Sequence, residues 1–204
     1  MEIQPEPVQK GNKFLMELGD LITGALLPFI VMLIFGSTIT MFAGMSDVAV
    51  QLTACIGGNV LIAAAYVIFG TKNGSVAYRK LYVNQTKRAL NSSELKVVYG
   101  TGEYAFWKGI VIPLISCVPY LIFQIINIAA PNSVCRFMLM YAFGWAYYPF
   151  TLAGLHEALG IVMIAVPMIA HAAGYFVGMR KEEKLQAQLE ATNAEEKAKK
   201  KKRK

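Results

Sequence analysis

Five stretches of this 204-residue sequence contain no charged residue, and each is at least 20 residues long. An α-helix rises 1.5 Å per residue, so about 20 apolar residues cross the roughly 30 Å hydrocarbon core of a membrane. Buried helices of soluble proteins average about 11–12 residues and rarely contain so long an uncharged run. The pattern therefore predicts an all-α integral membrane protein. The five stretches are residues 21–46, 48–71, 109–135, 137–156 and 158–179.

The composition agrees with this interpretation and excludes two other classes. Hydrophobic residues make up 55% of the chain and charged residues 16%, against about 25% charged in ordinary soluble domains. That apolar content excludes intrinsic disorder for most of the chain. Three cysteines are too few for a disulfide-framed secreted module, and their number is odd.

The distribution of Lys and Arg predicts the topology. Residues 72–108 carry seven basic and two acidic residues, and residues 180–204 carry ten and five. Because short Lys/Arg-rich segments stay on the cytoplasmic side, both should lie inside, and the chain between them crosses an even number of times. We therefore expect a four-helix bundle over residues 21–179, with segment 1–20, loop 70–108 and tail 180–204 cytoplasmic. The expected spans are 21–43, 48–69, 109–130 and 157–178.

The uncharged run that does not cross should be the aromatic one. Seven of the fourteen residues 137–150 are Phe, Tyr or Trp, and Pro149 interrupts a helix there. Trp and Tyr favour the headgroup level. We expect residues 132–153 to form an interfacial or re-entrant segment on the outer face. The alternative is a fifth span over 137–155, which would place the tail outside.

Polar side chains within the expected spans are the candidate functional residues, because polar groups at membrane depth usually face a partner or a cavity. One interpretation is that they hydrogen-bond between helices; the other is a polar path. Within this set, an i,i+3 pair on the third span shares one helix face. The acidic member should stabilise the start of its helix and pair with Arg136. The six residues are Gln51, Asn59, Gln124, Asn127, Glu157 and His171.

The segments outside the spans carry weaker signals. Residues 71–75 read as a turn after the second span. Phe106, Trp107 and Lys108 predict an interfacial anchor for the third span, with the lysine snorkelling to water. Gly174 and Gly178 form a close-packing motif, for use within the bundle or in a dimer.

The tail is rich in helix-forming residues and ends in a polybasic run. Such a run attracts anionic lipid headgroups or ribosomal RNA, without base specificity. The candidate contact residues are Lys197, Lys199, Lys200, Lys201, Lys202, Arg203 and Lys204.

The basic loop between spans and the Lys-rich tail resemble YidC-type membrane insertases over the last three expected spans. The resemblance implies that the tail engages the ribosome and that a basic residue in a membrane groove receives the substrate. No Lys or Arg lies within any expected span, so the groove residue has no counterpart here.

The sequence contains no Gly-x-Ser-x-Gly, Cys-x-x-Cys or Walker sequence and no His-Glu-x-x-His metal motif. We therefore expect no cofactor and favour a non-enzymatic binding, scaffold or accessory subunit. The alternatives are a small transporter or channel-like protein and an insertase-like factor. The expected location is a bacterial plasma membrane with both termini cytoplasmic, where the chain could form a homo- or hetero-oligomer.

Overall fold

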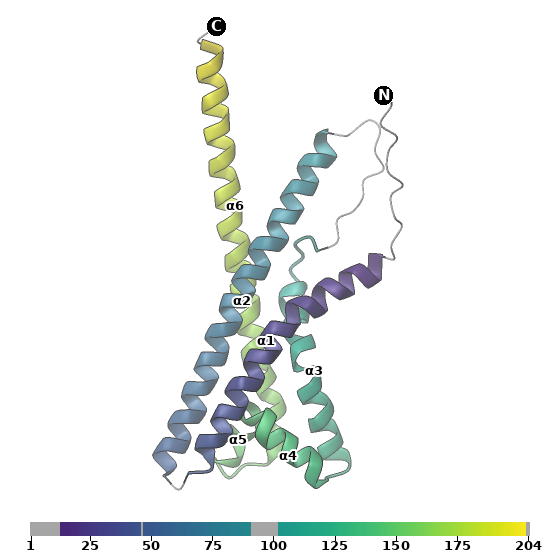
Figure 1. The fold of residues 1–204 in the computed structure, drawn as a ribbon, viewed down its shortest axis with the longest axis vertical. Helices are drawn as coiled ribbons and strands as arrows, with labels where there is room; N and C mark the ends of the chain where they lie inside the picture. The colour runs from purple at the N-terminus through teal and green to yellow at the C-terminus, as the bar shows by residue number, and fades with distance from the viewer. Residues whose placement is uncertain (1–12, 46, 91–101, 203–204) are drawn as a thin grey trace.

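The computed structural model describes residues 13–45, 47–90 and 102–202, and these residues are helical, without a β-strand (Figure 1). Four helical segments of the described chain are long and apolar enough to cross a membrane. Two shorter helices, α4 and α5, lie between the third and fourth of them. The elements are α1 (Lys13–Ala43), α2 (Val48–Leu90), α3 (Lys108–Ala129), α4 (Ser133–Ala142), α5 (Gly144–Thr151), the 3-10 helix η1 (Glu157–Ile164) and α6 (Ala165–Lys202).

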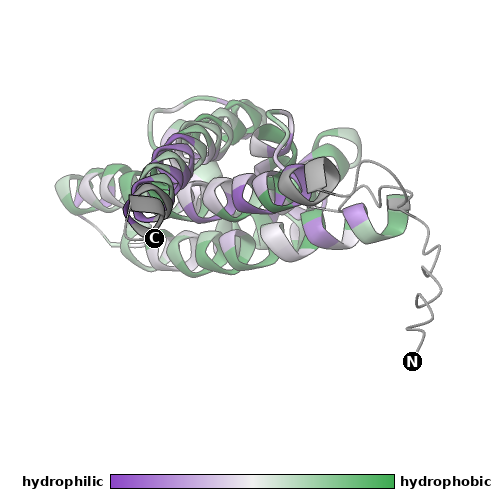
Figure 2. Cartoon of the chain, turned by 90° about the horizontal axis from the view of Figure 1, so that it is seen from above, coloured by the Kyte–Doolittle hydropathy of each residue, from purple (hydrophilic) through white to green (hydrophobic). Residues whose placement is uncertain are grey.

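The outer faces of the long helices are apolar. Ile34, Ile68 and Ile169 are 58%, 67% and 70% exposed, and many other large hydrophobic residues are exposed around the bundle. Figure 2 shows hydrophobic residues on most of the bundle and hydrophilic ones concentrated along the C-terminal part of α6. Soluble monomers rarely expose apolar surface on this scale. The bundle is therefore suited to a lipid environment.

Three helices are longer than the spans expected from the sequence. Helix α1 begins at Lys13 instead of residue 21. Helix α2 continues through residues 71–75, where a turn and the start of loop 70–108 were expected, and ends only at Leu90. Helix α6 continues from the membrane-spanning part into the tail without a break. The predicted third span differs from α3 by one residue at each end.

Residues 71–75 stay helical because α2 and α6 cross at their glycines. A Cβ on Gly70 or Gly74 would lie 2.3 or 2.0 Å from a backbone oxygen of α6, and one on Gly174 or Gly178 would lie 2.2 or 2.0 Å from a backbone oxygen of α2. Both helices thus offer a small-x-x-x-small face, which lets two backbones touch. The use of Gly174 and Gly178 for packing within the bundle is confirmed. Gly74, which suggested a turn, supplies the matching face.

Above this crossing, polar contacts hold the two parallel helices together. The Ser75 hydroxyl donates to the Gly178 carbonyl at 2.9 Å. Arg79 donates through two nitrogens to the Glu182 carboxylate at 2.8 and 3.1 Å, and Gln186 donates to the same carboxylate at 2.9 Å. Glu182 is only 3% exposed. These contacts continue the α2–α6 interface beyond the apolar segment.

The aromatic segment packs into the bundle more deeply than expected. Phe143, Trp145, Tyr147 and Tyr148 are buried, with Trp145 fully inaccessible, and they join the main hydrophobic core. Only Phe137 and Tyr141 are strongly exposed aromatic residues here. The reason is that the chain breaks at Phe143, so that α5 turns its aromatic face toward α1 and η1.

Neither short helix supports the five-span alternative. Helix α4 has 10 residues and α5 has 8, which correspond to about 15 and 12 Å of rise. Both lie at the end of the bundle opposite the projecting parts of α2 and α6 (Figure 1).

The lysine that was expected to snorkel is instead buried. Lys108 is 5% exposed; its ammonium group forms an ion pair with Glu17 and donates to the Glu103 carbonyl at 2.8 Å. The early start of α1 explains the difference, because it places Glu17 beside the beginning of α3. The neighbouring Phe106 and Trp107 are 62% and 47% exposed, as an interfacial anchor requires.

Candidate functional site

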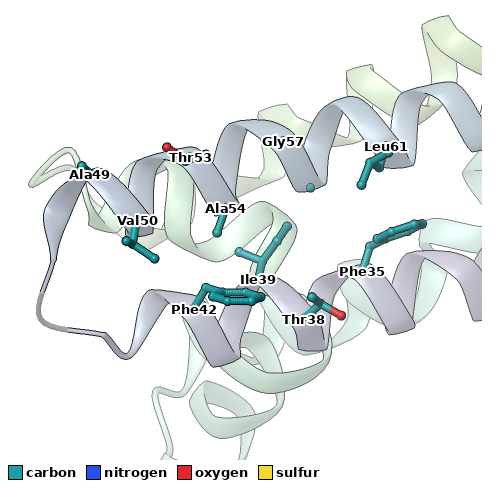
Figure 3. A pocket seen from close by; sticks show the side chains of 11 residues that line it. Phe35, Thr38, Ile39, Phe42, Ala49, Val50, Thr53, Ala54, Gly57 and Leu61 are labelled. Carbon is teal, nitrogen blue, oxygen red and sulfur yellow. The ribbon is translucent and has the colours of Figure 1, made fainter.

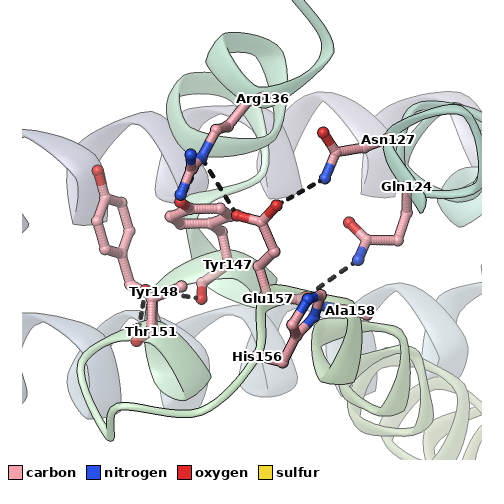
Figure 4. A network of polar contacts seen from close by, with 9 residues as sticks. All are labelled: Gln124, Asn127, Arg136, Tyr147, Tyr148, Thr151, His156, Glu157 and Ala158. Carbon is pink, nitrogen blue, oxygen red and sulfur yellow. Dashed lines mark hydrogen bonds and ion pairs between the residues drawn. The ribbon is translucent and has the colours of Figure 1, made fainter. Parts of the chain in front are cut away.

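Three of the six candidate residues meet at the α4–α5 end of the bundle (Figure 4). Asn127 Nδ2 donates to Glu157 Oε1 at 2.8 Å, and Gln124 Nε2 donates to the Glu157 backbone carbonyl at 3.0 Å. Arg136 Nε lies 3.3 Å from Glu157 Oε2. The ion pair that the sequence predicted between Arg136 and Glu157 is confirmed.

The local sequence explains how this cluster forms. Gln124 and Asn127 lie three positions apart on α3, so both amides face the same neighbour, and both are at most 4% exposed. Glu157 is the first residue of η1, where a carboxylate compensates the positive end of a helix. His156 caps the same helix, because its Nδ1 accepts a hydrogen bond from the Ala158 amide at 3.1 Å.

The charged groups of the cluster, Arg136 and Glu157, form an ion pair. The hydrogen bond to Tyr147 and the nearby Glu157 carboxylate raise the pKa of Arg136 above its ordinary value, so it remains cationic. The Arg136 side chain is 61% exposed, whereas that of Glu157 is 17% exposed. The two charges cancel, and the Asn127 amide donates to the other oxygen of the carboxylate. The arrangement therefore anchors α3 and α4 to η1.

Asn59 and Gln51 lie elsewhere. Asn59 Nδ2 donates to the carbonyls of Cys55, at 2.9 Å, and Trp145, at 3.1 Å. Gln51 lies near the first turn of α2 and donates to the Met45 carbonyl. Each of these side chains serves its own helix junction, apart from the Glu157 cluster.

His171 occupies a third place, between α2, α3 and α6. It is fully buried; its Nδ1 lies 2.8 Å from the Gly109 carbonyl and its Nε2 lies 3.3 Å from Asn73 Nδ2. A carbonyl only accepts, so Nδ1 carries the proton and Nε2 accepts from the amide. Asn73 is a residue that sequence reasoning missed, since it fell within the expected turn.

The basic terminal run lies at the end of α6. The helix backbone extends to Lys202, and Arg203 and Lys204 lie outside the described residues. Lys199 is the member of the run whose side chain is described, and it is exposed. From Arg180 to Lys202, α6 rises about 35 Å.

Within the described residues, no three His, Cys, Asp or Glu side chains are grouped to hold a metal ion. His156 and His171 serve separate helix junctions. Comparison of the chain with protein-family models, with curated proteins and with solved structures found no match.

Proposed function

We propose that the protein is a non-enzymatic binding or scaffold subunit of a bacterial plasma membrane, which presents the polybasic end of α6 to an acidic soluble partner in the cytoplasm. The four apolar helices serve as its anchor. The charges of residues 72–108 and of the tail support a cytoplasmic location for both termini. Ribosomal RNA is the acidic partner to test first.

The unbroken course of α6 is the observation that carries this proposal. Its part beyond Arg180 is about 35 Å long, whereas the Debye length at physiological salt is about 8 Å. A rigid helix that continues the direction of the membrane-spanning part holds its tip several Debye lengths from the headgroups. This geometry favours a soluble partner over the lipid of the protein's own membrane.

The base of the projecting helix is fixed, as a scaffold requires. Two contacts hold α6 against α2. The glycine crossing lies within the apolar segment, and the bidentate Arg79–Glu182 pair lies just beyond its end. The Tyr82 hydroxyl donates to Glu190, which extends the contact farther along the tail.

The other two functions receive less support. Only three of the six residues of the supposed polar path meet, and the other three lie at separate helix junctions, so the six do not line one route. An insertase would need a basic residue in a membrane groove. An apolar groove lies between α1 and α2, has a volume of about 520 Å³ and is lined by apolar residues and two threonines (Figure 3).

Co-sedimentation with ribosomes tests the proposal. The purified full-length protein in nanodiscs should bind ribosomes, and deletion of residues 197–204 should reduce that binding at least tenfold, because several phosphate contacts are lost. Binding should also fall steeply with added salt.

A helix-breaking variant tests the role of geometry. Gln188 is exposed on the projecting part of α6, and Gln188→Pro should bend the helix and weaken ribosome binding while all basic residues remain. Gln188→Ala is the matched control and should bind normally. Undiminished binding after deletion of 197–204 would refute the proposal. Equal binding by Gln188→Pro would show that the rigid projection is not needed.

A further inference from the structure

A second pocket lies at the end of the bundle from which α2 and α6 project. Its volume is about 290 Å³, and α1, α2, α3, α6 and Gly102 contribute to its wall. The charged residues of the wall are Glu17, Asp20, Lys72, Lys80 and Lys108, and Leu21 and Ile112 are among its apolar residues.

The charges of the pocket leave a positive excess. Lys108 is buried against Glu17. Lys80 lies 3.6 Å from Asp20 in a loose pair whose side chains are both nearly half exposed. Lys72 has no acidic partner among the described residues. An anion entering the pocket could pair with Lys72 directly. It could also pair with Lys80, because breaking the loose Lys80–Asp20 pair costs little free energy.

A buried hydroxyl provides an independent sign of a missing ligand. Tyr175 lines the pocket and is 1% exposed; its hydroxyl lies beside the Ala105 backbone, but the hydroxyl proton finds no acceptor among the described residues. Its ring is fixed by stacking on Tyr104, with centroids 5.1 Å apart. Buried polar groups are normally paired, so a polar atom in the pocket would satisfy this hydroxyl.

The position of the pocket identifies the chemistry of its ligand. The pocket is charged on one side and apolar at Leu21 and Ile112, which form a small hydrophobic cluster with Ala25. Exposed Phe106 and Trp107 mark the headgroup level beside it. A phospholipid has its phosphate at this level and its acyl chains below.

Gly102 forms part of the pocket wall beside Asp20 and Lys80. Its φ of +78° favours glycine, and a Cβ there would lie 2.5 Å from Asp20 Oδ2 and 2.6 Å from Lys80 Nζ. The chain therefore approaches the two charged groups as closely as a residue without a side chain permits.

We propose that this pocket binds the phosphate group of one anionic phospholipid through Lys72, Lys80 and the Tyr175 hydroxyl. The ligand is held at the junction of α1, α2, α3 and α6, on residues separate from the polybasic tail. It would join the start of α1 to the α2–α6 pair.

Native mass spectrometry of the full chain in detergent tests the proposal, with added phosphatidylglycerol as the probe. The unaltered protein should retain one lipid, and Lys72→Gln/Lys80→Gln should weaken retention at least tenfold. Lys184→Gln is the charge control, because Lys184 is exposed on the projecting part of α6, and it should retain lipid normally. Tyr175→Phe keeps the ring and should weaken retention severalfold without loss of folding.

Several outcomes would overturn the proposal. They are failure of the unaltered protein to retain lipid, unchanged retention by the folded double variant, and equal loss in Lys184→Gln. Inorganic phosphate is the second probe, and it should not displace the lipid at millimolar concentration. If it binds as tightly as the lipid does, the pocket takes a soluble phosphate and the assignment to a phospholipid is wrong.

Discussion

Two prolines in the bundle free backbone carbonyls that polar side chains from other helices then occupy. Pro113 has no N–H for the Gly109 carbonyl, which lies 2.8 Å from His171 Nδ1. Pro149 likewise frees the Trp145 carbonyl, which accepts from Asn59 at 3.1 Å. Polar residues at membrane depth are thus used here to satisfy backbone groups.

The contact between His171 and the Gly109 carbonyl predicts that one substitution offsets part of the effect of another. His171→Leu should destabilise the protein by roughly 1–2 kcal/mol, because the Gly109 carbonyl loses its donor. Pro113→Ala restores an N–H at the position that normally bonds this carbonyl, so it should cost less in the His171→Leu background than in the unaltered protein. A double-mutant cycle in SDS-induced unfolding measures the coupling. Strictly additive effects would mean that His171 does not replace the missing N–H.

The Glu157 cluster allows its neutral and ionic contacts to be separated. Arg136 is largely exposed, so Arg136→Gln should cost under about 1 kcal/mol of stability. Glu157→Leu removes the acceptor of the buried Asn127 amide and should cost roughly 1–3 kcal/mol. Glu157→Gln keeps an acceptor and should resemble Arg136→Gln. If Glu157→Gln proves as damaging as Glu157→Leu, the ion pair is the dominant contact.

At the scale of helices, the α2–α6 crossing has a matched control within α2. A Cβ at position 74 would lie 2.0 Å from the Tyr175 carbonyl oxygen, whereas one at position 57 would meet nothing within 4 Å. Gly74→Ala should therefore destabilise the bundle by roughly 1–3 kcal/mol through overpacking. Gly57→Ala should be neutral or slightly stabilising, since alanine favours the helix. Similar midpoints for the two variants in SDS titrations would show that the crossing is looser than the structure indicates.

The same crossing shows which part of the fold could be predicted from sequence. Charge-free runs mark the four long apolar helices because the cost of a charge in lipid acts on each residue locally. The course of α2 past Gly74 could not be predicted in this way. A glycine favours turns through its backbone freedom and close packing through its small size, and only the partner helix decides between them. A usable signal was the shared spacing of Gly70 with Gly74 and of Gly174 with Gly178.

The contacts of the candidate residues likewise fall into those that sequence spacing predicts and those that it does not. That Gln124 and Asn127 face one neighbour follows from helical spacing, and the pairing of Arg136 with Glu157 follows from their being the two isolated charges of that region. The partners of His171 and Asn59 depend on contacts between helices distant in sequence. The burial of Trp145 was also unpredictable, because an aromatic residue suits an interface and a core equally well.

At the scale of the whole molecule, the proposed scaffold depends on which side of the membrane each end occupies. Helices α4 and α5 lie at one end of the bundle and the end of α6 at the other (Figure 1). A cysteine at Ser133 or at Ala194 would report these ends, because both positions are exposed. The native cysteines 55, 117 and 135 are all buried, and replacing them by alanine provides the background for such probes.

In intact cells, an impermeant thiol reagent should label Ser133→Cys and leave Ala194→Cys unlabelled until the cells are opened. This outcome follows from the basic residues in the C-terminal half of α2 and at the start of the tail, which resist transfer across the membrane. Labelling of Ala194→Cys alone would invert the topology, and the polybasic end could then meet no cytoplasmic RNA. Labelling of both would require an even number of crossings between residues 133 and 194. Helices α4 and α5 would then have to cross as well and leave the core that Trp145 fills. The expected single-sided result is the condition on which a cytoplasmic partner for α6 rests.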